Sequence, residues 1–279
     1  MNRELAFAIL VSALCGGAVT AGGWWPFREM LTSSGRALER RAWLRIWVSF
    51  GPALVLFAVL CGWVLVEPVR TERLPRGLLL SALPFAVVLA RAVSRAIGSL
   101  ASHQDVTAAT IGLFRPRIIL SAEVIRALDK PALAAALEHE RAHARHRDPL
   151  RIWLAQLASD LFWPAPAAAA RLRCWRRALE LARDEEARSI GVAGPDLAEA
   201  IVSSIRLVAA GQPAGAATLS DSEFVEERVT RLLRPLEADP ARGQWSLPAL
   251  FIVSVPAPFA FFLGTQYGEG LVRFVLKIL

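Results

Sequence analysis

The sequence predicts an integral membrane protein that is mainly α-helical, with four transmembrane helices and a small α-rich soluble domain that carries a short β element. Two observations lead to this fold class. Of the 279 residues, 54% are hydrophobic, and the apolar excess lies in long segments without charge. Between the third and the fourth of these segments, a stretch of about 140 residues is long enough to form one domain with its own core.

Each expected span is long enough to cross a hydrocarbon core of about 30 Å as a helix. The four spans are residues 5–25, 46–66, 77–97 and 243–268. The third span is uncharged only as far as Ala90, but the long side chains of Arg91 and Arg95 can reach the interface from its end. A signal peptide is the alternative for the first segment, and the Trp24–Trp25 pair at its end favours a membrane anchor. The expected parts are therefore a membrane region, 1–98, a soluble domain, 99–242, a last span, 243–268, and a tail, 269–279.

The formal net charge is +7, and only two of the 32 basic residues are lysines. A basic chain suggests nucleic-acid binding, but the arginines are dispersed and no DNA- or RNA-binding module is recognised, so we expect no direct contact with nucleic acid. The first connection, Pro26–Ala42, carries four arginines against two glutamates. The positive-inside rule places this connection in the cytoplasm, which puts the soluble domain in the cytoplasm and both termini outside.

For the soluble domain, the sequence predicts one hairpin or a pair of edge strands, followed by helices. β-branched residues at both ends of 107–120 flank Gly112 and Pro116, which indicates the β element. Asp129 is expected to cap a helix with Pro131 in its first turn, and Asp196 to cap another. The expected helices are 122–128, 130–146, 150–162, 167–190, 197–210 and 223–233, with a connection at 211–222. The three cysteines have no paired spacing, which excludes a disulfide framework and a cysteine-based zinc site.

Three of the four histidines lie within eight residues, and the first two form a His-Glu-x-x-His pattern, His139 to His143. Four residues make slightly more than one helical turn, so both imidazoles project from one face and can hold one Zn²⁺. Glu140 beside them is placed to take a proton from an attacking water. The pattern predicts a zinc hydrolase, provided that a third protein ligand exists.

Two residues are candidates for the third zinc ligand. His146 lies three residues beyond His143, but one straight helix seldom wraps three side chains around a tetrahedral ion. Glu180, on a later helix, is the better candidate. Asp184 follows Glu180 by one turn and is placed to accept a hydrogen bond from the free N–H of a zinc-bound imidazole.

This combination resembles the gluzincin-type integral-membrane metallopeptidases, in particular the BlaR/MecR-type antirepressor and sensor family. The matching motifs are Gly112–Leu120, His139–His143 with Arg145–Pro149, Phe162-Trp163-Pro164, Glu180-x-x-x-Asp184 and Glu226–Leu233. The resemblance implies one Zn²⁺ held by His139, His143 and Glu180, with Glu140 as general base. It also implies a bacterial-type inner (cell) membrane and a protein or peptide substrate, for example a transcriptional repressor. Antibiotic-sensing members carry a large extracellular domain after the last span, whereas only Glu269–Leu279 follow here.

Two alternatives stay open at this point. The CAAX-processing and heat-shock membrane proteases share both metal motifs and act in protein quality control, and a signalling scaffold would keep zinc without catalysis. Many related enzymes use a Tyr or His donor for the oxyanion. Tyr267, the only tyrosine, falls in a span, so His103 and His146 are the remaining candidates for oxyanion or substrate contacts. Arg117–Leu120 is expected to act as an edge strand for an extended substrate.

Overall fold

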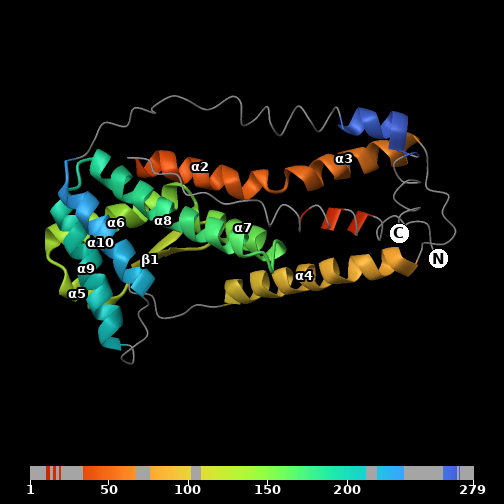
Figure 1. Ribbon diagram of the computed structural model, residues 1–279. Coiled ribbons are helices and arrows are strands. Elements are labelled where there is room, and N and C mark those ends of the chain that lie inside the picture. Colours follow the sequence, from red (N-terminus) through yellow and green to blue (C-terminus); the bar gives the residue numbers. More distant parts are fainter. Residues whose placement is uncertain are drawn as a thin grey trace.

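The computed structural model describes residues 11–12, 15–16, 19, 34–66, 76–101, 108–211, 219–235, 260–268 and 270. The helices are α2 (Gly35–Val48), α3 (Gly51–Val66), α4 (Arg76–Ala101), α5 (Ala122–Ala127), α6 (Lys130–Arg145), α7 (Asp148–Leu161), α8 (Pro166–Ser189), α9 (Gly194–Gly211) and α10 (Leu219–Leu233). Strands β1 (Ala108–Ile111) and β2 (Arg117–Leu120) form an antiparallel pair. The molecule is elongated: the sheet and α5 to α10 gather at one end, and α3 and α4 extend away from them (Figure 1). The predicted mainly helical fold with a small β element is confirmed.

The two extended helices leave large apolar side chains exposed, among them Phe57 and Leu65 on α3 and Leu83 and Val87 on α4. Within the described residues, Leu80–Gly98 is long and apolar enough to cross a membrane, and it matches the third expected span. The second expected span contains a bend of 41° between α2 and α3, and the two helices pass the same test only as a pair. The first expected span lies mostly outside the described residues. The fourth expected span also lies mostly outside the described residues, and its described part, 260–268, is helical. The four-span layout therefore stays a prediction.

The β-hairpin turns at a residue that only glycine suits well. Gly112 has φ +94°, and a Cβ atom there would lie 2.7 Å from the Arg115 carbonyl oxygen. The register pairs Thr110 with Ile118 and Ile111 with Arg117. The expected hairpin is therefore present, and it lies against α6 through both strands.

Local signals place most of the helix boundaries. The Asp129 carboxylate accepts from Ala132 N (2.8 Å) and begins α6, as predicted. The prediction that Asp196 caps the next helix is wrong, because α9 begins at Gly194 and Asp196 lies in its first turn, where an acid favours the helix dipole. The last domain helix, α10, begins at Leu219 rather than at residue 223.

Helix α2 begins within the stretch that the sequence predicts as a connection, and a distant residue explains why. The Glu185 carboxylate of α8 accepts from Gly35 N (2.5 Å) and Arg36 N (3.1 Å), which satisfies two of the free N–H groups at the start of α2. A Cβ atom on Gly35 would lie 2.8 Å from backbone carbon of Leu181, so the two helices approach closely. Ala42 and Ile46 then pack with Trp175 in a shared core. Helix α2 is thus part of the domain.

A buried acid joins the domain to the apolar helix α4. Asp160, near the end of α7, lies 3.3 Å from Arg91 Nη1 and 3.2 Å from Arg95 Nε. The Trp153 indole N–H also donates to the Ala96 carbonyl (3.1 Å). The two arginines that the sequence analysis expected to reach the interface therefore pair with the domain, and they fix α7 beside α4.

Close backbone approach joins residues 260–268 to α3. A Cβ atom on Gly264 would lie 2.0 Å from the Val59 carbonyl oxygen, and one on Gly268 would lie 2.3 Å from Trp63 Cβ. Small residues spaced four apart allow such contacts between membrane helices. This part of the fourth expected span therefore packs directly on α3.

We expect Gly264→Ala to lower the free energy of unfolding by about 1–3 kcal/mol, because the added methyl group must displace the backbone of α3. Gly270→Ala is the matched control, since nothing lies within 4 Å of its Cβ position. Thermal unfolding of both detergent-purified variants measures the difference. Equal unfolding midpoints for the two variants would contradict the packing described here.

Candidate metal centre

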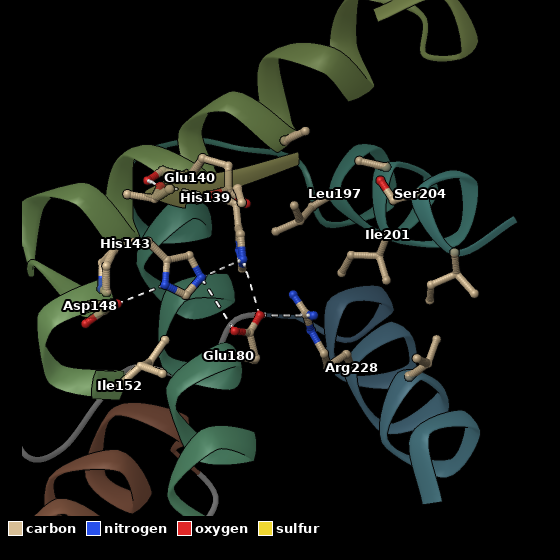
Figure 2. Close-up of a pocket in the computed structure, with 17 residues that line it drawn as sticks. His139, Glu140, His143, Asp148, Ile152, Glu180, Leu197, Ile201, Ser204 and Arg228 are labelled. Carbon is tan, nitrogen blue, oxygen red and sulfur yellow. Dashed lines mark hydrogen bonds and ion pairs between the residues drawn. The ribbon is translucent and has the colours of Figure 1, made fainter. Parts of the chain in front are cut away.

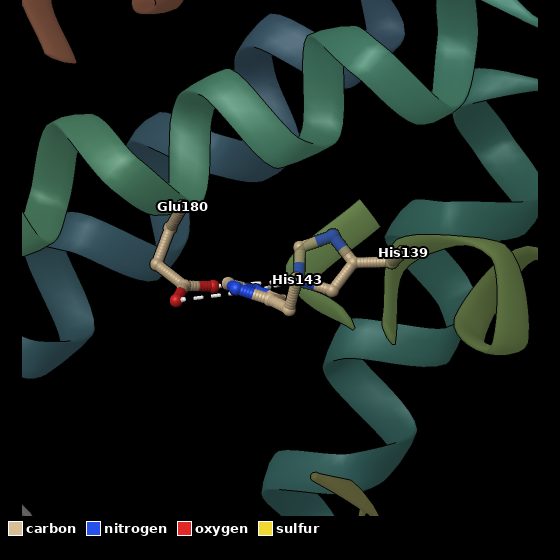
Figure 3. Close-up of side chains that lie close together, drawn as sticks. All are labelled: His139, His143 and Glu180. Atoms are coloured by element: carbon tan, nitrogen blue, oxygen red, sulfur yellow. Dashed lines mark hydrogen bonds and ion pairs between the residues drawn. The ribbon is translucent and has the colours of Figure 1, made fainter. Parts of the chain in front are cut away.

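Two imidazoles and one carboxylate from two helices converge on a single point (Figure 3). Helix α6 presents His139 and His143 one turn apart, with their Nε2 atoms 3.1 Å from each other. Helix α8 presents Glu180, whose carboxylate oxygens lie 3.5 Å from His139 Nε2 and 3.6 Å from His143 Nε2. Both histidines are buried and Glu180 is partly exposed. These three side chains form a group that is close enough to hold one metal ion.

The donor set and its spacing fit a zinc ion. Ligand atoms about 2.0–2.1 Å from a tetrahedral centre lie about 3.4 Å from one another, near the distances seen among the two Nε2 atoms and Glu180. The opposite ring nitrogen of each histidine faces a carboxylate, which assigns its proton to Nδ1. With Zn²⁺ bound, the Nε2 lone pair of each ring would then be free to hold the ion.

Asp148 supports His143, a contact that the sequence analysis did not assign. Its Oδ2 atom lies 2.9 Å from His143 Nδ1, and Arg183 of α8 holds both of its oxygens at 2.5 and 3.1 Å. Asp148 reaches this position because Arg147 adopts a left-handed conformation, φ 53°, between α6 and α7. The signal was present in the Arg-Asp-Pro stretch after the histidines, but the spacing alone does not show which side chain the aspartate faces.

Asp184 of α8 lies beside His139 on the other side of the site. The distance from Asp184 Oδ1 to His139 Nδ1 is 3.0 Å, although the contact is not aligned as a hydrogen bond. Arg228 of α10 donates to both Asp184 oxygens at 2.8 Å, and its Nη1 lies 3.2 Å from Glu180. Figure 2 shows this guanidinium reaching Glu180 from the opposite wall of the pocket. The sequence analysis did not single out Arg228, because no local pattern connects it to residues more than 40 positions earlier.

These contacts decide the charges of the metal-free site. Burial alone lowers the pKa of His139, but contacts with Asp184 and Glu180 outweigh it and raise the pKa to about 9. Burial by itself raises the pKa of Asp148, but the contacts with His143 and Arg183 outweigh this effect and lower the pKa to about 2. Burial likewise opposes ionisation of Glu180 and Asp184. The Arg228 cation outweighs this effect and keeps the pKa of each carboxyl group below the usual range. The site is therefore rich in ionised acids, with a proton on His139 where a metal cation would fit.

Glu140 points to the β-hairpin side of the histidines and lines the pocket. The Thr110 hydroxyl of β1 lies 2.8 Å from Glu140 Oε2 and 2.9 Å from the Glu140 carbonyl oxygen. Thr110 therefore fixes the glutamate beside the metal-binding group without occupying its second oxygen. Sequence reasoning placed Thr110 in a strand but gave it no role, since only the fold brings β1 to α6.

An open pocket of about 430 Å³ surrounds these groups (Figure 2). One wall is apolar and comes from α9 and α10, with Leu197, Ile201 and Val225 among its residues. Strand β1 contributes Ala109 and Thr110 to the lining. The pocket can thus accept an apolar side chain next to the His-His-Glu group.

Of the two histidines considered for oxyanion or substrate contacts, His146 is the one that lies within the described residues. His146 is exposed, and its Nε2 atom lies 2.8 Å from Glu186 on the surface of α8. It is absent from the residues that line the pocket and from the metal-binding group. His103 lies outside the described residues.

The fold and the site define a helical metallopeptidase with a His-Glu-x-x-His motif and a glutamate as the third metal-binding side chain. The chain belongs to the BlaR1 peptidase M56 family, whose model matches residues 42–232. The resemblance stated from the sequence is thereby confirmed, and the His-His-Glu group is consistent with a zinc metalloendopeptidase. Members of this family are membrane-bound, and a peptidase implies a protein substrate. Comparisons with curated proteins and with solved structures give no match.

In the metal-free protein, we expect the His139 imidazole to titrate near pH 9 instead of near 6.5. A folded-state pKa above the unfolded value means that this proton stabilises the fold fully below pH about 6.5, and that the stabilisation is lost as pH rises through about 9. NMR of histidine-labelled, metal-free protein measures the midpoint, and His139→Gln assigns the signal. A midpoint near 6.5 would show that the acids around His139 do not hold its proton.

Proposed function

We propose that this protein is a membrane zinc endopeptidase that hydrolyses a peptide bond of a cytoplasmic or membrane-proximal protein. In this proposal His139, His143 and Glu180 hold one Zn²⁺, and Glu140 is the general base. The observation that carries it is the convergence of two Nε2 atoms and a carboxylate within 3.6 Å, with an acid behind each imidazole. Two imidazoles and one carboxylate are a common ligand set of catalytic zinc, which leaves one coordination position open.

A bound Zn²⁺ supplies Lewis acidity, which polarises the substrate carbonyl and makes water a nucleophile near neutral pH. Glu140 accepts the proton of the attacking water and passes it to the leaving amine. The Thr110 hydroxyl, 2.8 Å from Glu140 Oε2, keeps the other carboxylate oxygen directed to the pocket. Asp148 and Asp184 hold the two imidazoles in the orientation that exposes Nε2.

The substrate is proposed to lie extended along β1. The sequence analysis expected the edge strand at Arg117–Leu120, but Ala109 and Thr110 of β1 are the strand residues that line the pocket. Among the described residues β1 pairs with β2 only, so its second edge has backbone groups for an added strand. The apolar wall formed by α9 and α10 then receives a hydrophobic side chain next to the scissile bond.

The domain is proposed to lie in the cytoplasm of a bacterial-type cell, at the inner membrane. Helix α2 belongs to the first connection, and its docking on α8 requires this connection and the domain to be on the same side. The arginine excess of that connection favours the cytoplasmic side. A regulatory protein such as a transcriptional repressor is the substrate class that the family resemblance favours.

The sidedness is testable at the tip of the β-hairpin, where Phe114 is 75% exposed. In a cysteine-free background, Phe114→Cys is expected to react with a membrane-impermeant maleimide only after the cells are opened. A cysteine placed in the tail, 269–279, is the comparison, since it is expected to react in intact cells. Labelling of Phe114→Cys in intact cells would place the domain outside and contradict this part of the proposal.

Replacing Glu140 by Gln separates an enzyme from a scaffold with structural zinc. We expect zinc content to stay near one per chain, because Glu140 is not a ligand, while proteolysis falls by about 10²–10⁴-fold. Glu180→Ala and His143→Ala are expected to lose both zinc and activity. Glu138→Gln is the matched control on the same helix, since Glu138 pairs with Arg141 and Arg145 away from the pocket.

Zinc analysis and cleavage of β-casein or a peptide library by the detergent-purified chain provide the two readouts. Proteolysis that survives Glu140→Gln would refute the general-base role. Zinc retained in Glu180→Ala would refute the ligand set, and a wild-type chain without zinc would refute the metalloenzyme.

A further inference from the structure

A continuous chain of charged contacts runs from α2 to the histidine pair. Glu39 of α2 forms an ion pair with Arg151 of α7, and Arg151 Nη1 lies 3.0 Å from Asp148 Oδ1. The other oxygen of Asp148 is 2.9 Å from His143 Nδ1. Two side chains therefore separate α2, which continues into the apolar helix α3, from a metal-binding imidazole.

The environment of Arg151 shields most of this chain of contacts from water. Its guanidinium lies 4.7 Å from the Trp43 ring centroid and 5.7 Å from that of Trp175, between α2 and α8. Glu39 is 7% exposed and also accepts from the Trp175 indole N–H at 3.3 Å. Asp148 is fully buried. Charges so enclosed interact more strongly than surface pairs, and each depends on its partner to offset lost hydration.

The charge balance at Asp148 depends on Glu39. Two arginines, Arg151 and Arg183, contact Asp148, and each also contacts a glutamate, Glu39 or Glu186. Without Glu39 the partly buried Arg151 cation remains with a single acidic partner, Asp148, directly behind His143. Arg151 would then compete with His143 for Asp148, and the added positive charge would oppose a metal cation in the pocket.

We propose that Glu39 and Arg151 are positioning residues of the metal centre, which hold Asp148 and, through it, the His143 imidazole. Helix α2 thereby contributes one side chain, Glu39, to the support of the metal-binding site. The inference rests on the proposed function in taking the metal to be Zn²⁺. The inference gives the first connection of the chain a role in the site. Its position, 100 residues before the histidines, does not by itself indicate such a role.

A matched pair of variants tests this role in the full-length, detergent-purified chain. Glu39→Gln removes the charge next to Arg151 with little change of shape. Glu185→Gln weakens the docking of α2 at its N-terminus instead, where it touches neither Arg151 nor Asp148. Chelator competition measures the zinc dissociation constant, and the visible spectrum of the Co²⁺-loaded protein reports the geometry of the ligands. Arg151→Lys and Arg151→Gln form a second pair, in which lysine keeps the charge.

We expect Asp148→Asn to raise the zinc dissociation constant by about 10–100-fold, the range found for a direct partner of a ligand. Glu39→Gln, one contact further away, should raise it by about 3–10-fold and shift the Co²⁺ spectrum, whereas Glu185→Gln should do neither. Arg151→Lys should keep more of the affinity than Arg151→Gln. In an Asp148→Asn background, Glu39→Gln should have no further effect, because its action passes through Asp148.

Three results would overturn the inference. These are wild-type affinity and spectrum in Glu39→Gln, equal losses in Glu39→Gln and Glu185→Gln, or a full effect of Glu39→Gln in the Asp148→Asn background. In each case the wild-type chain still binds zinc, so the proposed function stands and only the role of Glu39 and Arg151 fails. A wild-type chain without zinc overturns both.

Discussion

Buried charge is the constraint on which the rest of this structure depends. His139 and His143 are oriented by Asp184 and Asp148, and those acids are paired with Arg228, Arg183 and Arg151. Breaking a buried pair costs several kcal/mol, because the remaining charge stays without hydration, whereas a surface pair contributes about 0–1 kcal/mol. The pairing therefore fixes α6, α7, α8 and α10 relative to one another far more firmly than surface pairs such as Glu138–Arg141.

The same network shows how a small helical domain can bring two imidazoles and a carboxylate together with little regular sheet. Alanines at the buried positions of α6, among them Ala135, Ala136 and Ala142, let neighbouring helices approach closely. Close approach allows short acids on α7 and α8 to reach the imidazoles. The two-stranded hairpin lines the pocket and brings Thr110 to Glu140. The His-His-Glu group and Glu140 are thus supported by different elements.

The site is also connected to the apolar helices by specific contacts. The α7–α8 pair reaches α4 through Asp160, and it reaches α2 through Arg151 and Glu185. The far end of α3 packs on residues 260–268 through glycines. A peptidase built in this way has its pocket on a frame that is continuous with its membrane-type helices. A change in the packing of those helices therefore has a direct physical route to the residues behind His143.

The sequence by itself determined the metallopeptidase class and most of the local structure. Helical spacing puts His139 and His143 on one face, the Asp129–Pro131 pattern begins α6, and Gly112 with Pro116 marks the hairpin, because each of these depends on residues a few positions apart. The same spacing argument linked Glu180 to Asp184. Only the tertiary structure decided which acids and arginines support them. Asp148 faces His143 because of the left-handed turn at Arg147, Arg228 arrives from α10, and Glu39 arrives from a stretch that the sequence presented as a connection. A charged side chain that loses its hydration on burial needs an oppositely charged partner. These partners come together only when distant helices pack, so a local sequence pattern does not identify them.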